Sequence, residues 1–154
     1  SKLKYVLKGG RSSIGVESTI INLTNNISIL RLGGLNVSKI KQILKRQILI
    51  KNKSKNKLSP GLFPLHYSPG IPLRMNAKKL NKGEAFILIK KRKINSKNYF
   101  FLSKNNNLIN AAKNLYPLMR KIKNKGYKKI AVEKIPNIGI GQTINDRLER
   151  ASKY

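Results

Sequence analysis

The sequence predicts an α/β protein in which a small first unit and a larger second unit are joined by an extended linker. Segments rich in β-branched and aromatic residues alternate with segments whose apolar residues recur at helical spacing. Residues 51–57 contain only Lys, Asn and Ser, which marks a solvated boundary between the units. The hydrophobic fraction of 40% in 154 residues is enough to bury a core.

The first unit is predicted to contain a β-hairpin followed by a helix. Residues 14–23 and 27–32 read as strands joined by a short turn of Thr and Asn. A helix is expected from about Ser38, as its N-cap, to about Leu49. Its apolar residues recur at spacings of three and four, so one face should pack on the hairpin.

The second unit is predicted to contain three strands and two helices. Strands are expected at 83–89, 99–103 and 128–136. A helix is expected at 108–125, with a kink or an early end at Pro117, and a last helix follows a glycine-rich turn. The order strand, strand, helix, strand, helix predicts at least one parallel pair of strands.

Composition limits the classes of function. The charge of +29, from 34 basic and five acidic residues, favours polyanionic partners, although lysines spread among Asn and Ile are also typical of a biased coding composition. There is no cysteine and only one histidine, so we expect no metal site built by the protein. No signal peptide and no membrane-spanning segment is indicated, so we expect a cytoplasmic protein without a membrane partner.

The single histidine lies in an unusual segment. Residues 59–69 hold three prolines and a glycine, which remove backbone donors and favour an extended strap over a surface. This strap would present His66 and Tyr67 to a site. The alternative is that His66 is an ordinary surface residue and Tyr67 a packing anchor.

Ser18 and Arg31 are the candidate binding residues of the first unit. In a strand, Ser18 would face the side opposite Glu17 and Thr19, and a hydroxyl without a nearby histidine suits binding better than nucleophilic attack. Arg31 precedes two glycines that admit close backbone approach, so its guanidinium could bind a carboxylate or a phosphate. A solvated strand arginine is the alternative.

The segment 139–150 has two glycines before a helix, an arrangement that can hold anions. It lacks the third glycine of the dinucleotide fingerprint and the Lys-Ser/Thr pair of a P-loop. The alternative is a turn that leads into a docked helix, where Asn145 or Asp146 braces the loop.

Four blocks of the sequence point together to a known family. They are Gly9-Gly10 with Gly15-Val16-Glu17-Ser18-Thr19-Ile20, Ile29-Leu30-Arg31-Leu32-Gly33-Gly34-Leu35, Ser59 to Pro69, and Gly139 to Ala151. In this order they resemble the threonylcarbamoyl-adenylate synthase family, in the form that has a YrdC-type catalytic domain, a linker and a small C-terminal domain.

The resemblance implies three parts: residues 1–50 as the C-terminal remnant of a YrdC-like α/β domain, 51–73 as the linker, and 74–154 as a small Rossmann-like α/β domain. The catalytic domain of this family is longer than 50 residues. The chain therefore resembles a C-terminal portion that is inactive alone, with the remaining catalytic part supplied in cis or in trans.

The resemblance also implies an activity. Such an enzyme condenses L-threonine, bicarbonate and ATP, with Mg²⁺ accompanying the ATP, into threonylcarbamoyl-AMP and pyrophosphate for the synthesis of threonylcarbamoyladenosine in tRNA. By position, Ser18 would contact threonine, Arg31 the ATP or adenylate, and His66 and Tyr67 would form a lid near the nucleotide phosphates. The alternative is a stand-alone basic module that binds a nucleotide or, non-specifically, tRNA without catalysis.

Overall fold

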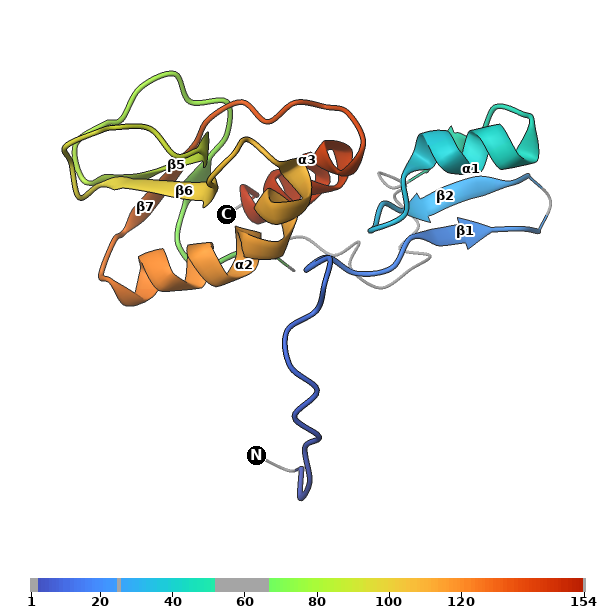
Figure 1. The fold of residues 1–154 in the computed structure, drawn as a ribbon, viewed down its shortest axis with the longest axis horizontal. Coiled ribbons are helices and arrows are strands. Elements are labelled where there is room, and N and C mark those ends of the chain that lie inside the picture. The colour runs from blue at the N-terminus through green and yellow to red at the C-terminus, as the bar shows by residue number, and fades with distance from the viewer. Residues whose placement is uncertain (1–2, 25, 52–66, 154) are drawn as a thin grey trace.

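The computed structural model describes residues 3–24, 26–51 and 67–153. It contains two sheets, a three-stranded one in the first unit (residues 15–51) and a four-stranded one in the second unit (residues 67–153). The two lie side by side in Figure 1, with helix α3 of the second unit turned toward the first. The expected α/β class is confirmed. Most of the predicted strap, including His66, lies outside the described residues.

The first unit is a small sheet with one helix. Strands β1 (Ile20–Asn22) and β2 (Ser28–Arg31) form the predicted antiparallel hairpin, and β3 (Leu49–Ile50) adds to β2 in parallel. Helix α1 (Val37–Leu44) packs on this sheet. The core between them consists of Ile29, Leu32, Val37, Ile40 and Ile48.

Three expectations for the first unit were wrong. Residues 14–19 are not a strand, because regular pairing begins only at Ile20. The N-cap of α1 is Asn36, whose side chain accepts a hydrogen bond from the Ser38 amide at 3.0 Å. The helix ends at Leu44, since Lys45 adopts a left-handed conformation with φ of 48°. The residues that follow are then free to form β3.

The second unit is a parallel sheet in the order β4-β7-β5-β6. The strands β5 (Glu84–Lys90) and β6 (Tyr99–Ser103) lie at the predicted places, and β7 (Lys129–Val132) begins as predicted but ends four residues before position 136. The short edge strand β4 (Leu73–Arg74) was not expected. Helices α2 (Leu108–Asn124) and α3 (Ile140–Ala151) are also as predicted. Helix α2 runs through Pro117 without ending early.

Both faces of the parallel sheet are covered. On β5, Ala85, Ile87 and Ile89 join the main core under α2 and α3, while Phe86 and Leu88 join a smaller core on the opposite face. This alternation, with both sets buried, is the pattern of a strand in the middle of a parallel sheet. Within the ranges described above, none of the helices is long and apolar enough to cross a membrane.

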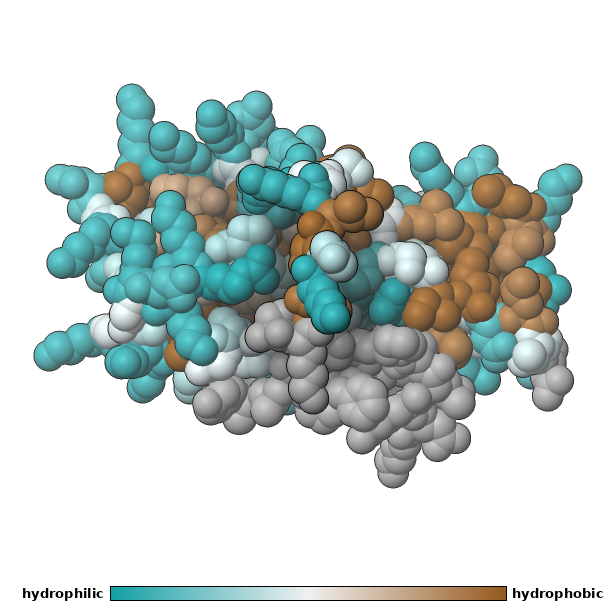
Figure 2. Space-filling model, turned by 90° about the horizontal axis from the view of Figure 1, so that it is seen from below, coloured by the Kyte–Doolittle hydropathy of each residue, from teal (hydrophilic) through white to brown (hydrophobic). Residues whose placement is uncertain are grey.

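The surfaces of the two units differ. Hydrophilic side chains cover most of the second unit in Figure 2, while hydrophobic side chains gather over the first unit at the right of the same view. Ile43 at the end of α1 is 79% exposed and Leu49 of β3 is 62% exposed. Large apolar side chains at such exposure, gathered on one lobe, are typical of a surface that another part of a protein covers.

Candidate functional site

The two units meet where residues 15–19 and the Leu32–Gly34 turn reach helices α2 and α3. The Gly34 amide donates to the Glu17 carbonyl at 3.0 Å, and the Thr143 hydroxyl of α3 donates to the Gly33 carbonyl at 2.9 Å. Gly33 fits so tightly that a Cβ there would lie 2.2 Å from the Thr19 amide nitrogen. The two predicted glycine positions therefore serve a close contact between backbone segments.

Arg147 of α3 is the centre of this junction. Its side chain is fully buried. Its Nε donates to Glu17 Oε2 at 3.1 Å, Nη2 donates to the Leu32 carbonyl at 2.6 Å, and Nη1 forms a short contact with Asp146 Oδ2. One guanidinium thus binds two segments of the first unit at once. Such charge-assisted hydrogen bonds are stronger than neutral ones.

The charges around this guanidinium balance. Arg150 also binds Asp146, through Nε at 3.2 Å and Nη2 at 3.0 Å. Two arginines therefore face the two carboxylates of Asp146 and Glu17. Burial acts to lower the pKa of Arg147, but its ionisable neighbours, among them Tyr67 and Glu17, raise the pKa by more. The arginine remains charged, as a buried ion pair requires.

Tyr67 and Tyr116 extend the junction toward the second unit. Their rings stack with centroids 5.6 Å apart and an angle of 18° between the planes. The Arg147 guanidinium carbon lies 4.6 Å from the centre of the Tyr67 ring, within cation–π range. Burial raises the pKa of both tyrosine hydroxyls, and the positive charge of Arg147 opposes that rise. Both hydroxyls stay protonated at neutral pH and can donate hydrogen bonds.

The structure brings Ser18 and Arg31 together. Arg31 Nη2 donates to Ser18 Oγ at 3.1 Å, and Nε donates to the Ser18 carbonyl at 3.1 Å. Arg31 is buried at the end of β2, while Ser18 is exposed. Ser18 is not in a strand, so strand alternation does not set its direction. It still differs from its neighbours, because Glu17 turns to Arg147 and Thr19 bonds the Leu35 backbone.

Tyr67 packs against Arg147, and Arg31 also lies within electrostatic range of its hydroxyl. Tyr67 is 7% exposed, as the packing-anchor interpretation expects. In the segment 139–150, Asn145 Nδ2 donates to the Ile135 carbonyl at 3.2 Å and so braces the loop before α3. This contact agrees with the interpretation of the segment as a turn that leads into a docked helix. Asp146 serves the two arginines instead.

Sequence reasoning missed the role of Arg147. Charged residues are almost never fully buried unless they are paired, so the sequence alone does not single out Arg147 as a buried residue. The block from Asn145 to Leu148 was the available signal, because it was already part of the family resemblance.

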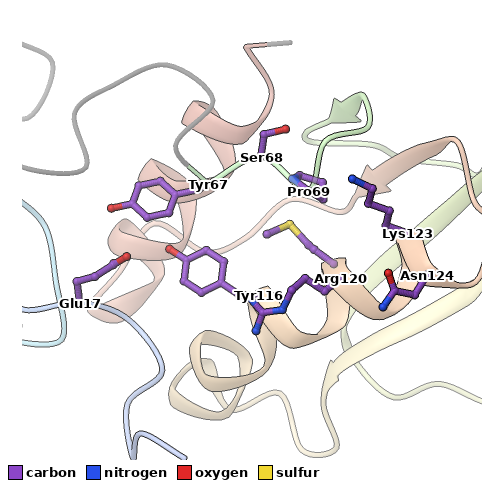
Figure 3. A pocket seen from close by; sticks show the side chains of 9 residues that line it. Glu17, Tyr67, Ser68, Pro69, Tyr116, Arg120, Lys123 and Asn124 are labelled. Carbon is purple, nitrogen blue, oxygen red and sulfur yellow. The ribbon is translucent and has the colours of Figure 1, made fainter. Parts of the chain in front are cut away.

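A cavity of about 560 Å³ opens beside the junction (Figure 3). Glu17 lies at one end, with the hydroxyls of Tyr67 and Tyr116 directed toward it, and Lys123 lies at the other end. The remaining lining residues are Ser68, Pro69, Met119, Arg120 and Asn124. This size suits a small molecule.

The fold and the junction together define an α/β protein of two units. Arg147 of its last helix is buried and hydrogen-bonds to Glu17 and to the Leu32 carbonyl of the first unit. The family described as "Threonylcarbamoyl-AMP synthase, C-terminal domain" matches residues 35–153. The chain belongs to this family, and the resemblance drawn from the sequence is confirmed.

Known relatives agree with this assignment. The curated threonylcarbamoyl-AMP synthase of Pyrococcus abyssi (strain GE5 / Orsay) is 26% identical over 173 residues, covering 99% of this chain and 50% of the relative. The crystal structure of P. abyssi Sua5 complexed with L-threonine matches with a TM-score of 0.77 at 25% identity, covering 95% of this chain and 48% of that one.

A second solved structure matches as well. It is a P. abyssi Sua5 variant in which a histidine and the tyrosine next to it are replaced by alanine, with a TM-score of 0.68, 25% identity, and coverage of 95% and 45% of the two chains. The chain thus spans about half the length of the relatives that it matches.

Proposed function

We propose that this chain works as part of a threonylcarbamoyl-AMP synthase, which joins L-threonine, bicarbonate and ATP into threonylcarbamoyl-AMP and releases pyrophosphate. The observation that carries this proposal is the fold match, across nearly the whole chain, to a homologue solved with L-threonine. The product would serve the formation of threonylcarbamoyladenosine in tRNA. Residues 1–50 would complete a YrdC-like catalytic domain, 51–73 would be the linker, and 74–154 the small C-terminal domain.

In this proposal, Ser18 and Arg31 form one edge of the substrate pocket. The Ser18 hydroxyl, held at 3.1 Å from Arg31 Nη2, would bind threonine. The Arg31 guanidinium would face the negative charge of ATP and of the adenylate. Because Arg31 is buried and bonded to Ser18 through two nitrogens, it is already oriented before substrate arrives.

His66 and Tyr67 would belong to a lid near the nucleotide phosphates. The support is that an adjacent histidine and tyrosine were replaced in the solved P. abyssi variant, and this chain, with its single histidine, has only one such pair. Tyr67, packed on Arg147, would be the fixed end of the lid. A closed lid would keep water from a labile mixed anhydride.

The remaining catalytic part, in cis or in trans, would cover the apolar surface of the first unit. The exposed Ile43 and Leu49 lie on this surface, and β3 is an edge strand of its sheet. An edge strand with exposed apolar side chains is suited to further strand pairing.

The test is to isolate the native protein with an antibody against the exposed loop 91–97 and to measure its intact mass and its synthase activity together. We expect pyrophosphate release from ATP that requires both threonine and bicarbonate. A preparation of full synthase length without threonine-dependent release would contradict the proposal. A mass of 17.4 kDa would instead direct the assay to mixtures with a separate catalytic part.

A second candidate function is a basic module that binds RNA without catalysis. The observation that favours it is the basic run at residues 90–93, which is exposed at the end of β5. Binding of this kind predicts that the affinity for tRNA falls steeply with salt and that any polyanion competes. Retention of tRNA at high salt against excess heparin would contradict non-specific binding.

A further inference from the structure

We propose that the cavity between Glu17 and Lys123 binds a small organic anion that carries a planar ring, at a site separate from Ser18 and Arg31. The proposed synthase function uses one wall residue of this cavity, Tyr67, and gives no role to its cationic end at Arg120 and Lys123. Its volume of about 560 Å³ lies within the range of about 300–1,000 Å³ that is typical of small-molecule sites.

The inner part of the cavity suits a ring. Tyr67 and Tyr116 form one wall and the buried Met119 side chain another, and together these give flat and polarisable apolar surfaces. The Tyr116 hydroxyl is buried at the inner edge of this wall, where the Arg147 guanidinium is its polar neighbour.

The end of the cavity at Glu17 determines which polar groups the ring of the ligand can carry. The carboxylate lies near both tyrosine hydroxyls in Figure 3, and one of its oxygens accepts from Arg147 at 3.1 Å. This end therefore offers hydrogen-bond acceptors and donors whose charge is already balanced by the arginine. A ring with an N–H or O–H group at its inner edge would fit here, whereas an anionic group would meet the carboxylate.

The other end is cationic. Arg120 and Lys123 come from successive turns of α2, and Asn124 adds an amide. Lys123 is held over the Ser68–Gly70 turn, where a Cβ on Gly70 would lie 2.6 Å from its Nζ. A phosphate or carboxylate is the group that a guanidinium and an ammonium bind together. The cavity thus combines an apolar wall, a polar inner end and a cationic outer end.

The test uses methionine methyl resonances, because the sequence has only two methionines. With methyl-¹³C-methionine in the full chain, phenyl phosphate is titrated at about 150 mM salt, which screens distant charges. We expect a saturable shift of Met119 and none of Met75, which lies beside Asn76 and Ile135 at a different pocket. Inorganic phosphate lacks the ring and benzyl alcohol lacks the anionic group, so each should bind at least about tenfold more weakly than phenyl phosphate.

A matched pair of variants separates this site from general attraction to a basic protein. Replacing Arg120 and Lys123 by alanine should weaken phenyl phosphate about tenfold or more. Replacing Lys121 and Lys125, which are exposed basic residues of the same segment outside the cavity, should leave the affinity unchanged.

Three results would each overturn the proposal: no movement of the Met119 methyl, equal weakening by both pairs of substitutions, or inorganic phosphate binding as tightly as phenyl phosphate. The measurement needs no synthase activity and leaves Ser18 and Arg31 untouched. A negative result here therefore leaves the proposed function standing, and loss of the proposed function would leave this cavity standing.

Discussion

Replacement of Arg147 by methionine tests whether this buried guanidinium holds the two units together. The substitution keeps a long apolar side chain against Tyr67 but removes the hydrogen bonds to Glu17, Asp146 and the Leu32 carbonyl. Breaking a buried pair by removing one partner costs about 3–5 kcal/mol. Asp146 keeps Arg150, and the Glu17 side chain is already 35% exposed, so we expect the lower end, about 3 kcal/mol.

The assay is urea unfolding followed by circular dichroism and by tyrosine fluorescence, since the chain has no tryptophan. The control is Arg92→Met, which removes an ion pair to Glu133 at 2.8 Å from a side chain that is 55% exposed and should cost at most about 1 kcal/mol. We also expect the two probes to separate into two transitions in Arg147→Met, because the junction is weakened. Equal costs for the two variants, with a single transition in each, would refute this reasoning.

Three further changes have defined outcomes. Gly33→Ala should lower the unfolding free energy by about 1–3 kcal/mol because its Cβ would meet the Thr19 segment, whereas Gly9→Ala, with nothing within 4 Å, should be neutral; urea midpoints measure both. The hydrogen bond from Arg74 holds the pKa of Glu84 below its usual range, so its contribution to stability is complete above the ordinary glutamate pKa and is lost as the pH falls through the lower folded value. Thermal midpoints should therefore drop below about pH 4 in the wild type and less steeply in Glu84→Gln; equal slopes would contradict the assignment. In a complete synthase, Arg31→Ala should reduce kcat/KM for ATP at least about tenfold, and Arg31→Lys should recover only part of it; unchanged kinetics in both would remove Arg31 from the site.

The long elements could be predicted because local pattern and tertiary environment agree. Strand β5 is a continuous apolar run and α2 carries its apolar residues on one stripe, and both were found within one or two residues. Pro117 did not break α2, because the helix is held by the buried Leu115, Met119 and Ile122 on either side of it. Tertiary packing outweighed the local signal.

The short elements could not be predicted. Leu49 and Ile50 continue the apolar spacing of α1, and the left-handed turn at Lys45 that separates them has no glycine to signal it. In the candidate site, the sequence indicated Ser18 and Arg31 as separate binding residues, and the structure brings them into contact. Their link to Arg147 depends on a contact between residues more than a hundred positions apart, which no local pattern reports.

The parallel strand order has a consequence for synthesis on the ribosome. Among the described residues, strand β4 pairs with β7 alone, through Leu73 and Ile130, so the first strand of the larger sheet gains this partner only after most of that unit has been made. The contacts between the two units form later still, because Thr143 and Arg147 follow β7 in the sequence. The β1–β2 hairpin can form early, but the Leu32–Gly34 turn that follows β2 gains its contacts with Thr143 and Arg147 only with the last helix. A nascent chain paused before α3 therefore exposes both an unpaired strand and an unanchored turn, and we expect the main risk of misfolding at that stage.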